Sequence, residues 1–464
     1  MHYPSLSVLS FFSAALVGVV RGPATHLPSP WGEMLVKHEW THVPVNWVTL
    51  GHPPDGASID LNIALKPDRE KALTDALLEV SQPGSPKRVI FTAPLFEAYS
   101  CVPLLRFRYG AHLTKQQVAQ LVAPHPDTFE LVTSWLKYNG IPPSSISTTH
   151  GGSWLTVPGV PVSQANRLLG ASYQLFHHPG TNETILRTVR YALPDALHTH
   201  VKTITPTTAF TSTSFPKHET PRNRSGAVVN GPSGDSVGML SRQEVDEIDI
   251  TPSILRSLYG TTTYRPVATI QNTLGIMGYR NQIPKLMDLI KFMDDFCDEE
   301  IDYQLPITRI INELYQSEYG VQATMDVEYG VGLVYLTPVI YYRSSGNGMV
   351  FLPNKMPSVF DEYVELLDYL INQPNAPRTL SLGYGTPELS IPWEYADAVC
   401  NLFAQLGSRG ISILVASGDA GVGLGNCINI YGGVQFYTSF PASCMCGIYS
   451  LLASYAQAQV QVDH

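Results

Sequence analysis

The chain has 464 residues, of which 44% are hydrophobic and 15% are charged, so it is long enough to bury two hydrophobic cores. Its net charge is −10, from 29 basic and 39 acidic residues, and it contains no sustained basic run. This argues against nucleic acid or an anionic membrane surface as a partner. The 36 glycines and 36 prolines indicate many loops.

An apolar segment opens the chain. From Leu6 to Val20 there is no charged side chain, and the run ends at small residues. The run is too short for a membrane span and is typical of a cleaved signal peptide, which we place at residues 1–22. We therefore expect a secreted, extracellular protein without a membrane span. In that compartment the sequons at Asn182 and Asn223 are candidate glycosylation sites.

Residues 31–202 alternate short strands with helices. The period-two pattern of 58–65 predicts a strand and the stripe over 72–80 a helix. Thr114 and Gln117 form a capping box that opens a second helix. The other elements predicted here are a helix at 126–138 and strands at 153–157, 172–176 and 185–191. This order predicts an α+β sandwich with an antiparallel sheet.

The next segment, 203–243, is rich in Thr, Ser, Pro and Gly and reads as a linker suited to processing. Its Asp235 stands in a Ser-Gly-Asp-Ser turn with no buried strand before it, so we assign it no chemistry.

A second domain is predicted at 244–444. Its strands are expected at 273–277, 307–311, 339–342, 379–382 and 411–416, and its helices at 284–296, 322–335, 361–370 and 392–406. This alternation predicts an α/β fold whose parallel sheet carries helices on both faces.

Two positions in this second domain could carry chemistry. Asp419 follows the continuous apolar strand 411–416 in a glycine-rich turn, at the strand end where α/β sheets gather functional groups. On the residues alone, an aspartate in such a turn is more often a turn former. Gln322 and Asp326 are four apart and project from one face of a helix, which could also be an ordinary solvated face.

The six cysteines are too few for a disulfide scaffold in a chain of this length. Cys427 and Cys444 flank a short excursion and form a candidate bridge in an oxidising compartment. Cys400 lies on the buried face of the predicted helix 392–406, where we expect a free core thiol. The 14 histidines show no metal-ligand spacing, so no metal site is predicted from the residues.

The second domain resembles the sedolisins, or serine-carboxyl peptidases, especially their secreted fungal tripeptidyl-peptidase branch. The likeness rests on EIDITPSILRSLYG, SLGYGTPE, AVCNLFAQLGSRGISILVASGDAGVG and FPASC. It implies a subtilisin-like fold and an enzyme that releases tripeptides from polypeptide amino termini in acid. HEWTHVPVNWVTLG and YGAHLTKQQVAQLVAPHPDTFELVTSWLKYNGI in the first domain resemble the pro-kumamolisin activation domain, which assists folding and blocks the cleft until removed.

The resemblance assigns roles to the candidate residues. It places Asp419 as the acid that stabilises the oxyanion, and Asp326 as the acid that orients a glutamate base. The base position is occupied by Gln322, whose amide cannot take up a proton. The family's Ser-Gly-Thr-Ser-Ala nucleophile segment and carboxyl-terminal calcium loop are not found, since the divergent tail 445–464 follows Cys444. We therefore expect a partial peptidase domain without the serine or the calcium site, and an inactive chain.

Residues 88–108 also depart from the family pattern, as an apolar insertion that a translated intron would explain.

Three interpretations of the whole chain follow. The chain is a tripeptidyl peptidase by descent that acts on polypeptides, or a dead homologue whose activation domain inhibits a related active peptidase, or a defective gene model of an active enzyme. Transcript sequencing would discriminate best among them.

Overall fold

A computed structural model describes the chain over thirteen segments: 30–81, 110–180, 182–211, 250–265, 272–279, 282–297, 305–311, 318–334, 336–344, 361–418, 435–436, 438–444 and 448–451. Several predictions fall outside these residues: the signal peptide, the 88–108 insertion, most of the linker, Asn223, Asp419 and Cys427.

The amino-terminal domain is built on antiparallel sheets, as predicted. The largest has the order β4-β5-β3-β9, from Ser147–Thr148, Trp154–Pro161, Ser58–Leu65 and Val201–Thr205. A second has the order β2-β6-β7, from Val48–Gly51, Gln174–His178 and Glu183–Arg187, while β1 (Met34–Glu39) pairs with β8 (Arg190–Pro194). The helices are α1 (Ala72–Ser81), α2 (Lys115–Val122), α3 (Pro126–Tyr138), α4 (Val162–Leu169) and α5 (Asp195–His198), with 3₁₀ turns η1 (Pro143–Ser145) and η2 (His150–Gly152).

Local sequence signals explain much of this domain. Thr114 caps α2, and the capping box with Gln117 is confirmed. Strand β3 places Ile59, Leu61 and Ile63 in the domain's own core. Its opposite face is buried as well, because Ala64 packs into a core shared with the second domain. The observed burial on both faces therefore goes beyond the alternation that predicted this strand.

The second domain contains a six-stranded parallel sheet of order β12-β14-β10-β15-β17-β19. These strands span Ile307–Ile310, Val339–Arg343, Leu274–Gly278, Thr379–Leu382, Ser412–Ala416 and Ile448–Leu451. The helices are α7 (Pro252–Leu258), α8 (Leu286–Phe296), α9 (Val321–Val334), α10 (Glu362–Asn372) and α11 (Trp393–Ser408), with η3 at Glu388–Ser390. Two short ladders complete it: β11 (Gln282–Ile283) with β13 (Glu318–Tyr319), and β16 (Thr386–Pro387) with β18 (Ser439–Phe440).

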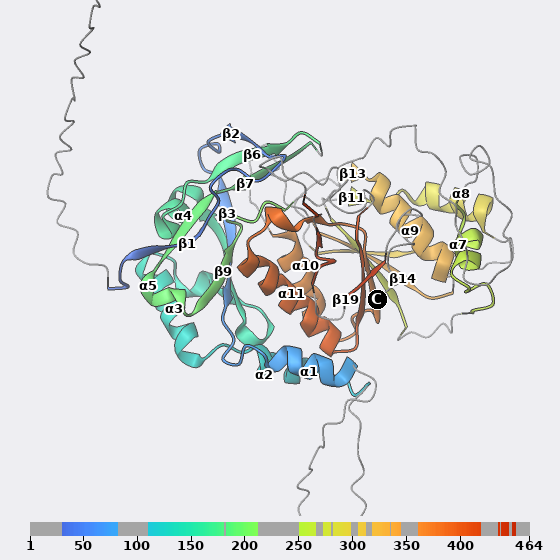
Figure 1. Cartoon of the computed structure of the whole chain (residues 1–464), viewed down its shortest axis with the longest axis horizontal. Helices are drawn as coiled ribbons and strands as arrows, with labels where there is room; N and C mark the ends of the chain where they lie inside the picture. The colour runs from blue at the N-terminus through green and yellow to red at the C-terminus, as the bar shows by residue number, and fades with distance from the viewer. Residues whose placement is uncertain are drawn as a thin grey trace, which may run out of the picture.

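Helices cover both faces of the parallel sheet, which confirms the predicted α/β class. On β10, Leu274 and Ile276 pack in one core with α8 and α9. Met277 belongs to the core of the opposite face, with α10 and α11. Figure 1 shows α10 and α11 between this sheet and strands β3 and β9 of the amino-terminal domain. These two helices are thus shared by the two domains.

Two predicted boundaries are wrong. The strand expected at 185–191 is two strands, β7 and β8, which pair with different partners. The linker expected from 203 begins later, because β9 runs to Thr205 and residues through Thr211 are buried. Beyond these boundaries, β19 of the divergent tail pairs in parallel with β17 at the edge of the sheet.

Candidate active site

The candidate site lies where parallel strands of the second domain end. Strands β10, β15 and β17 are neighbours in parallel register, so their carboxyl ends meet at one edge of the sheet. Ligand and reaction sites of α/β proteins are built at this edge. Helix α9 brings its first two turns against the residue that follows β15, because Gly383 lies against Gln322 and Asp326.

Gln322 and Asp326 are directly hydrogen bonded. The Nε2 atom of Gln322 donates to Oδ1 of Asp326 at 2.7 Å, across one turn of α9. The prediction that the two side chains share one helix face is confirmed. An amide in this position can donate to a carboxylate but cannot accept a proton at neutral or acid pH.

The second carboxyl oxygen of Asp326, Oδ2, differs from the first in its contacts. Oδ2 is buried and has no hydrogen-bond partner within the part of the chain that the structure describes. Although some of the residue remains accessible, burial of the carboxyl raises its pKa to about 7, against the smaller lowering effect of the Gln322 hydrogen bond. Asp326 is therefore largely protonated in acid, and its O–H is then a donor for which the described residues supply no acceptor.

Gly383 permits this close approach. A Cβ at this position would lie 2.8 Å from Gln322 Nε2 and 2.9 Å from each carboxylate oxygen of Asp326. A side chain here would displace the pair. The sequence reasoning missed this residue. A glycine directly after a buried strand was the available signal, since such a glycine often marks close approach of another group.

Gln282 braces the start of α9. Its backbone oxygen accepts from the Tyr341 hydroxyl at 3.0 Å, and its side-chain oxygen accepts from the Tyr384 hydroxyl at 3.3 Å. Gln282 also belongs to β11, which pairs with β13 immediately before α9. Hydrogen bonds from the middle of β14 and from the loop after β15 thus fix the β11–β13 ladder that immediately precedes α9. Sequence reasoning gave no signal for this short ladder.

The third component of the predicted site is only partly described. Strand β17 ends at Ala416, and Ser417 and Gly418 follow; Gly418 has a φ of 95°, which suits a glycine turn. Ser417 Oγ is buried and has no partner among the described residues. The position of Asp419 is outside those residues, so its predicted role stays a prediction.

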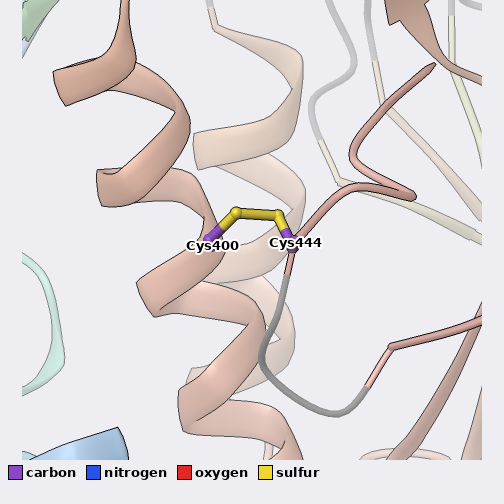
Figure 2. Close-up of a disulfide and its surroundings, with 2 residues drawn as sticks. All are labelled: Cys400 and Cys444. Atoms are coloured by element: carbon purple, nitrogen blue, oxygen red, sulfur yellow. A yellow bond between two sulfur atoms is a disulfide. The ribbon is translucent and has the colours of Figure 1, made fainter. Parts of the chain in front are cut away.

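The disulfide prediction is wrong. Cys444 is bonded to Cys400 of α11, not to Cys427, and Cys400 is therefore not the free core thiol that was expected (Figure 2). The two Cα atoms are 5.4 Å apart, within the usual range for a disulfide. The strand pairing of β18 with β16 brings the loop that carries Cys444 beside α11, a contact 44 residues apart in sequence that spacing alone does not reveal.

Other expectations concern modification, metal and membrane. Asn182 lies exposed at the β6–β7 turn, with a φ of 57°. Over the described segments no group of three or more His, Cys, Asp or Glu side chains is arranged to hold a metal ion. Over the same segments no helix is long and apolar enough to cross a membrane.

Comparisons with known proteins identify both halves of the chain. The family model of the pro-kumamolisin activation domain matches residues 106–210. A probable tripeptidyl-peptidase SED3 of Arthroderma benhamiae is 30% identical over 417 residues, which are 87% of this chain and 64% of that protein. Tripeptidyl-peptidase SED4 of Arthroderma otae is 29% identical, over 92% of this chain and 66% of its own length.

Among solved structures, a Pseudomonas sedolisin (serine-carboxyl proteinase) complexed with pseudo-iodotyrostatin is 18% identical, with a TM-score of 0.31. It covers 43% of this chain and 52% of its own, a likeness too weak to define the fold. The chain spans about two thirds of the length of the curated relatives it matches. The activation-domain match falls in the amino-terminal domain, and the tripeptidyl-peptidase matches run through both domains. Together they support the sedolisin family, in its fungal tripeptidyl-peptidase branch, as the family that this chain resembles.

Proposed function

We propose that this chain is a secreted pro-form of the serine-carboxyl tripeptidyl-peptidase lineage in which the general base has been lost. The hydrogen bond from Gln322 to Asp326 carries this proposal. It retains the geometry of a base and its orienting acid, but the group in the base position is an amide. Proteins of this lineage would act on polypeptides and release tripeptides from their amino termini in acid. With Gln322, proton transfer from a serine nucleophile has no acceptor at that position.

The path of the chain out of the amino-terminal domain supports the pro-form assignment. After β9, the backbone N–H of Phe210 donates to the carbonyl of Ser390 at 2.9 Å. Ser390 ends the 3₁₀ turn η3, which follows β15 and β16 in the second domain. The last described residues of the amino-terminal domain are therefore hydrogen bonded to the second domain, as expected of an activation domain that docks on its peptidase.

Hydrolysis of a tripeptide chromogenic substrate at acid pH tests the loss of the base. We expect turnover no higher than that of an Asp326→Ala, Asp419→Ala double variant. Higher turnover would contradict the proposal. If the transcript encodes a Ser-Gly-Thr-Ser segment, Gln322→Glu in that form is expected to raise turnover by about 10²–10⁴, the usual contribution of a positioned base.

A second candidate function is inhibition of a related active peptidase by the amino-terminal domain. It is supported by the docking of this domain on α10 and α11, which share one hydrophobic core with Ala64, Trp154 and Ala209. The test titrates a fragment of residues 30–211, with 88–108 removed, against an active sedolisin. Surface binding and loss of turnover are expected, and a folded fragment that does not bind would refute this function.

The third candidate, a defective gene model, concerns 88–108 and 445–464. Pairing of β19 with β17 weighs against it for the tail, because residues 448–451 extend the sheet there. Transcript sequencing tests it directly. Removal of either stretch by splicing would support a longer active enzyme, whereas an uninterrupted message through both stretches would refute it.

A further inference from the structure

A charged cluster is buried where the amino-terminal domain meets α10 and α11. Arg187 of β7 is 1% exposed, and Asp361 and Glu362 at the start of α10 are 2% and 1% exposed. Around them the contact is apolar, since Ala64 and Ala209 share one core with both helices. Charges are almost never buried this completely unless opposite charges compensate them, and here the cation and the acids come from different domains.

Asp361 accepts hydrogen bonds from both domains. Its Oδ1 accepts from the backbone N–H of Val364 and from the hydroxyl of Tyr395, each at 3.1 Å, so the carboxylate caps α10 and ties it to α11. Its Oδ2 accepts from the Thr205 hydroxyl, in the amino-terminal domain, at 2.6 Å. The acid that begins α10 is therefore also a contact point for the other domain.

Arg187 is held by backbone carbonyls of its own domain. Its Nε donates to the carbonyl of Ala209 at 2.7 Å, and Nη1 donates to the carbonyl of Leu186 at 2.9 Å. Burial lowers the pKa of the guanidinium, and the carboxylate of Asp361 is the strongest influence in the opposite direction. The largest compensation for a buried cation of one domain thus comes from the other.

Two further polar contacts between the domains, both made by lysines, lie nearer to solvent. Lys202 pairs with Asp397 of α11, with side chains 20% and 44% exposed. Lys115 donates to the carbonyl of Asn372, at the end of α10, at 3.0 Å. Exposed ion pairs contribute little, because water solvates and screens them whether or not they pair. These contacts add affinity but discriminate weakly between partners.

We propose that the buried pair Arg187 and Asp361, with Thr205, selects the peptidase domain onto which the amino-terminal domain docks. A peptidase domain without an acid at the start of the helix equivalent to α10 would leave the guanidinium buried and uncompensated. An amino-terminal domain without Arg187 would leave the carboxylates of Asp361 and Glu362 buried without a compensating positive charge. Docking of a mismatched partner is thus disfavoured, because it buries a charge without an opposite charge to compensate the cost of removing it from water. This cost is a common source of specificity. The proposal rests on the two-domain family assignment and not on hydrolysis.

The test cuts the purified full chain at a protease site introduced within residues 212–249 and measures whether the two halves stay together on dilution. Asp361→Asn keeps the shape of the acid, and Thr205→Val removes only the 2.6 Å hydrogen bond. Each is expected to weaken association about tenfold or more, because hydrogen bonds to charged groups exceed neutral ones. The other hydrogen bonds near Asp361 and Thr205 are expected to remain in both variants. Circular dichroism of the uncut proteins checks that they fold.

A double-variant cycle distinguishes pairing from general damage. Arg187→Met combined with Asp361→Asn is expected to weaken association less than the product of the single effects, because neither charge is then left alone. Lys202→Met is the matched control at the rim, with an expected change below about threefold. Independent effects of Arg187→Met and Asp361→Asn, or a control effect as large as theirs, would overturn the proposal. Hydrolysis plays no part in these measurements, so failure of the proposed function leaves them interpretable.

Discussion

Two buried aspartates in the second domain have opposite surroundings. Asp361 receives three hydrogen bonds, from Thr205, Val364 and Tyr395, and faces a buried guanidinium. Asp326 receives one, from Gln322, and its Oδ2 has no partner among the described residues. A carboxylate with every acceptor site used holds structure together. One with an open oxygen and a perturbed pKa is typical of a functional site.

The strongest test of this difference between the two aspartates is to remove Asp361, the one whose carboxylate is hydrogen bonded through both oxygens. Asp361→Ala deletes the cap of α10 and leaves Arg187 buried without its main compensating charge. We expect a loss of about 3–5 kcal/mol in the free energy of unfolding, the range seen when one partner of a buried ion pair is removed. Urea denaturation of the full chain measures it.

The matched control for that experiment is Asp397→Ala, which removes an acid from the exposed ion pair with Lys202. Its expected cost is below about 1 kcal/mol. Similar losses for the two alanine variants would mean that the interface does not depend on buried charge.

The pair at the candidate site could be predicted from local spacing, whereas its surroundings could not. Four-residue separation on a helix was enough to place Gln322 beside Asp326. The capping box of Thr114 was equally local. By contrast, the hydrogen bonds of Gln282 come from Tyr341 and Tyr384, which are 59 and 102 residues away in the sequence. No periodic pattern encodes a contact of that kind.

The same distinction explains the errors in the core and disulfide predictions. Trp393 lies seven residues before Cys400, at a spacing that predicts the same helix face, but it stands at the first helical position and is 74% exposed. Cys400 was on the correct face and assigned the wrong state, because its partner arrives through the β16–β18 pairing. Helical periodicity gives the face of a residue and leaves open what covers that face.

A smaller effect is expected from neutralising the unsatisfied acid. Folding raises the pKa of Asp326 from 3.8 to about 7, so the folded state holds a proton that the unfolded state releases between these values. The contribution of Asp326 to stability is therefore present below pH 3.8 and is lost as pH rises to about 7. Asp326→Asn should remove this dependence and be more stable than the unsubstituted chain above pH 7, by on the order of 2 kcal/mol given its partial exposure. Unfolding curves from pH 4 to 8 measure both slopes, and equal slopes would contradict the assignment.

The smallest expected effect comes from filling the space beside the pair. Gly383→Ala places a methyl group 2.8–2.9 Å from the polar atoms of Gln322 and Asp326, closer than packing allows. The cost should be about 1 kcal/mol, the lower end for overpacking, because α9 begins at Val321, which is 86% exposed, and its first turn can shift. In a Gln322→Ala background the nearest of these contacts is removed, so the cost of Gly383→Ala should fall, and thermal unfolding of the four proteins measures the coupling. An unchanged cost would mean that Gly383 is needed for its backbone alone and does not position the site.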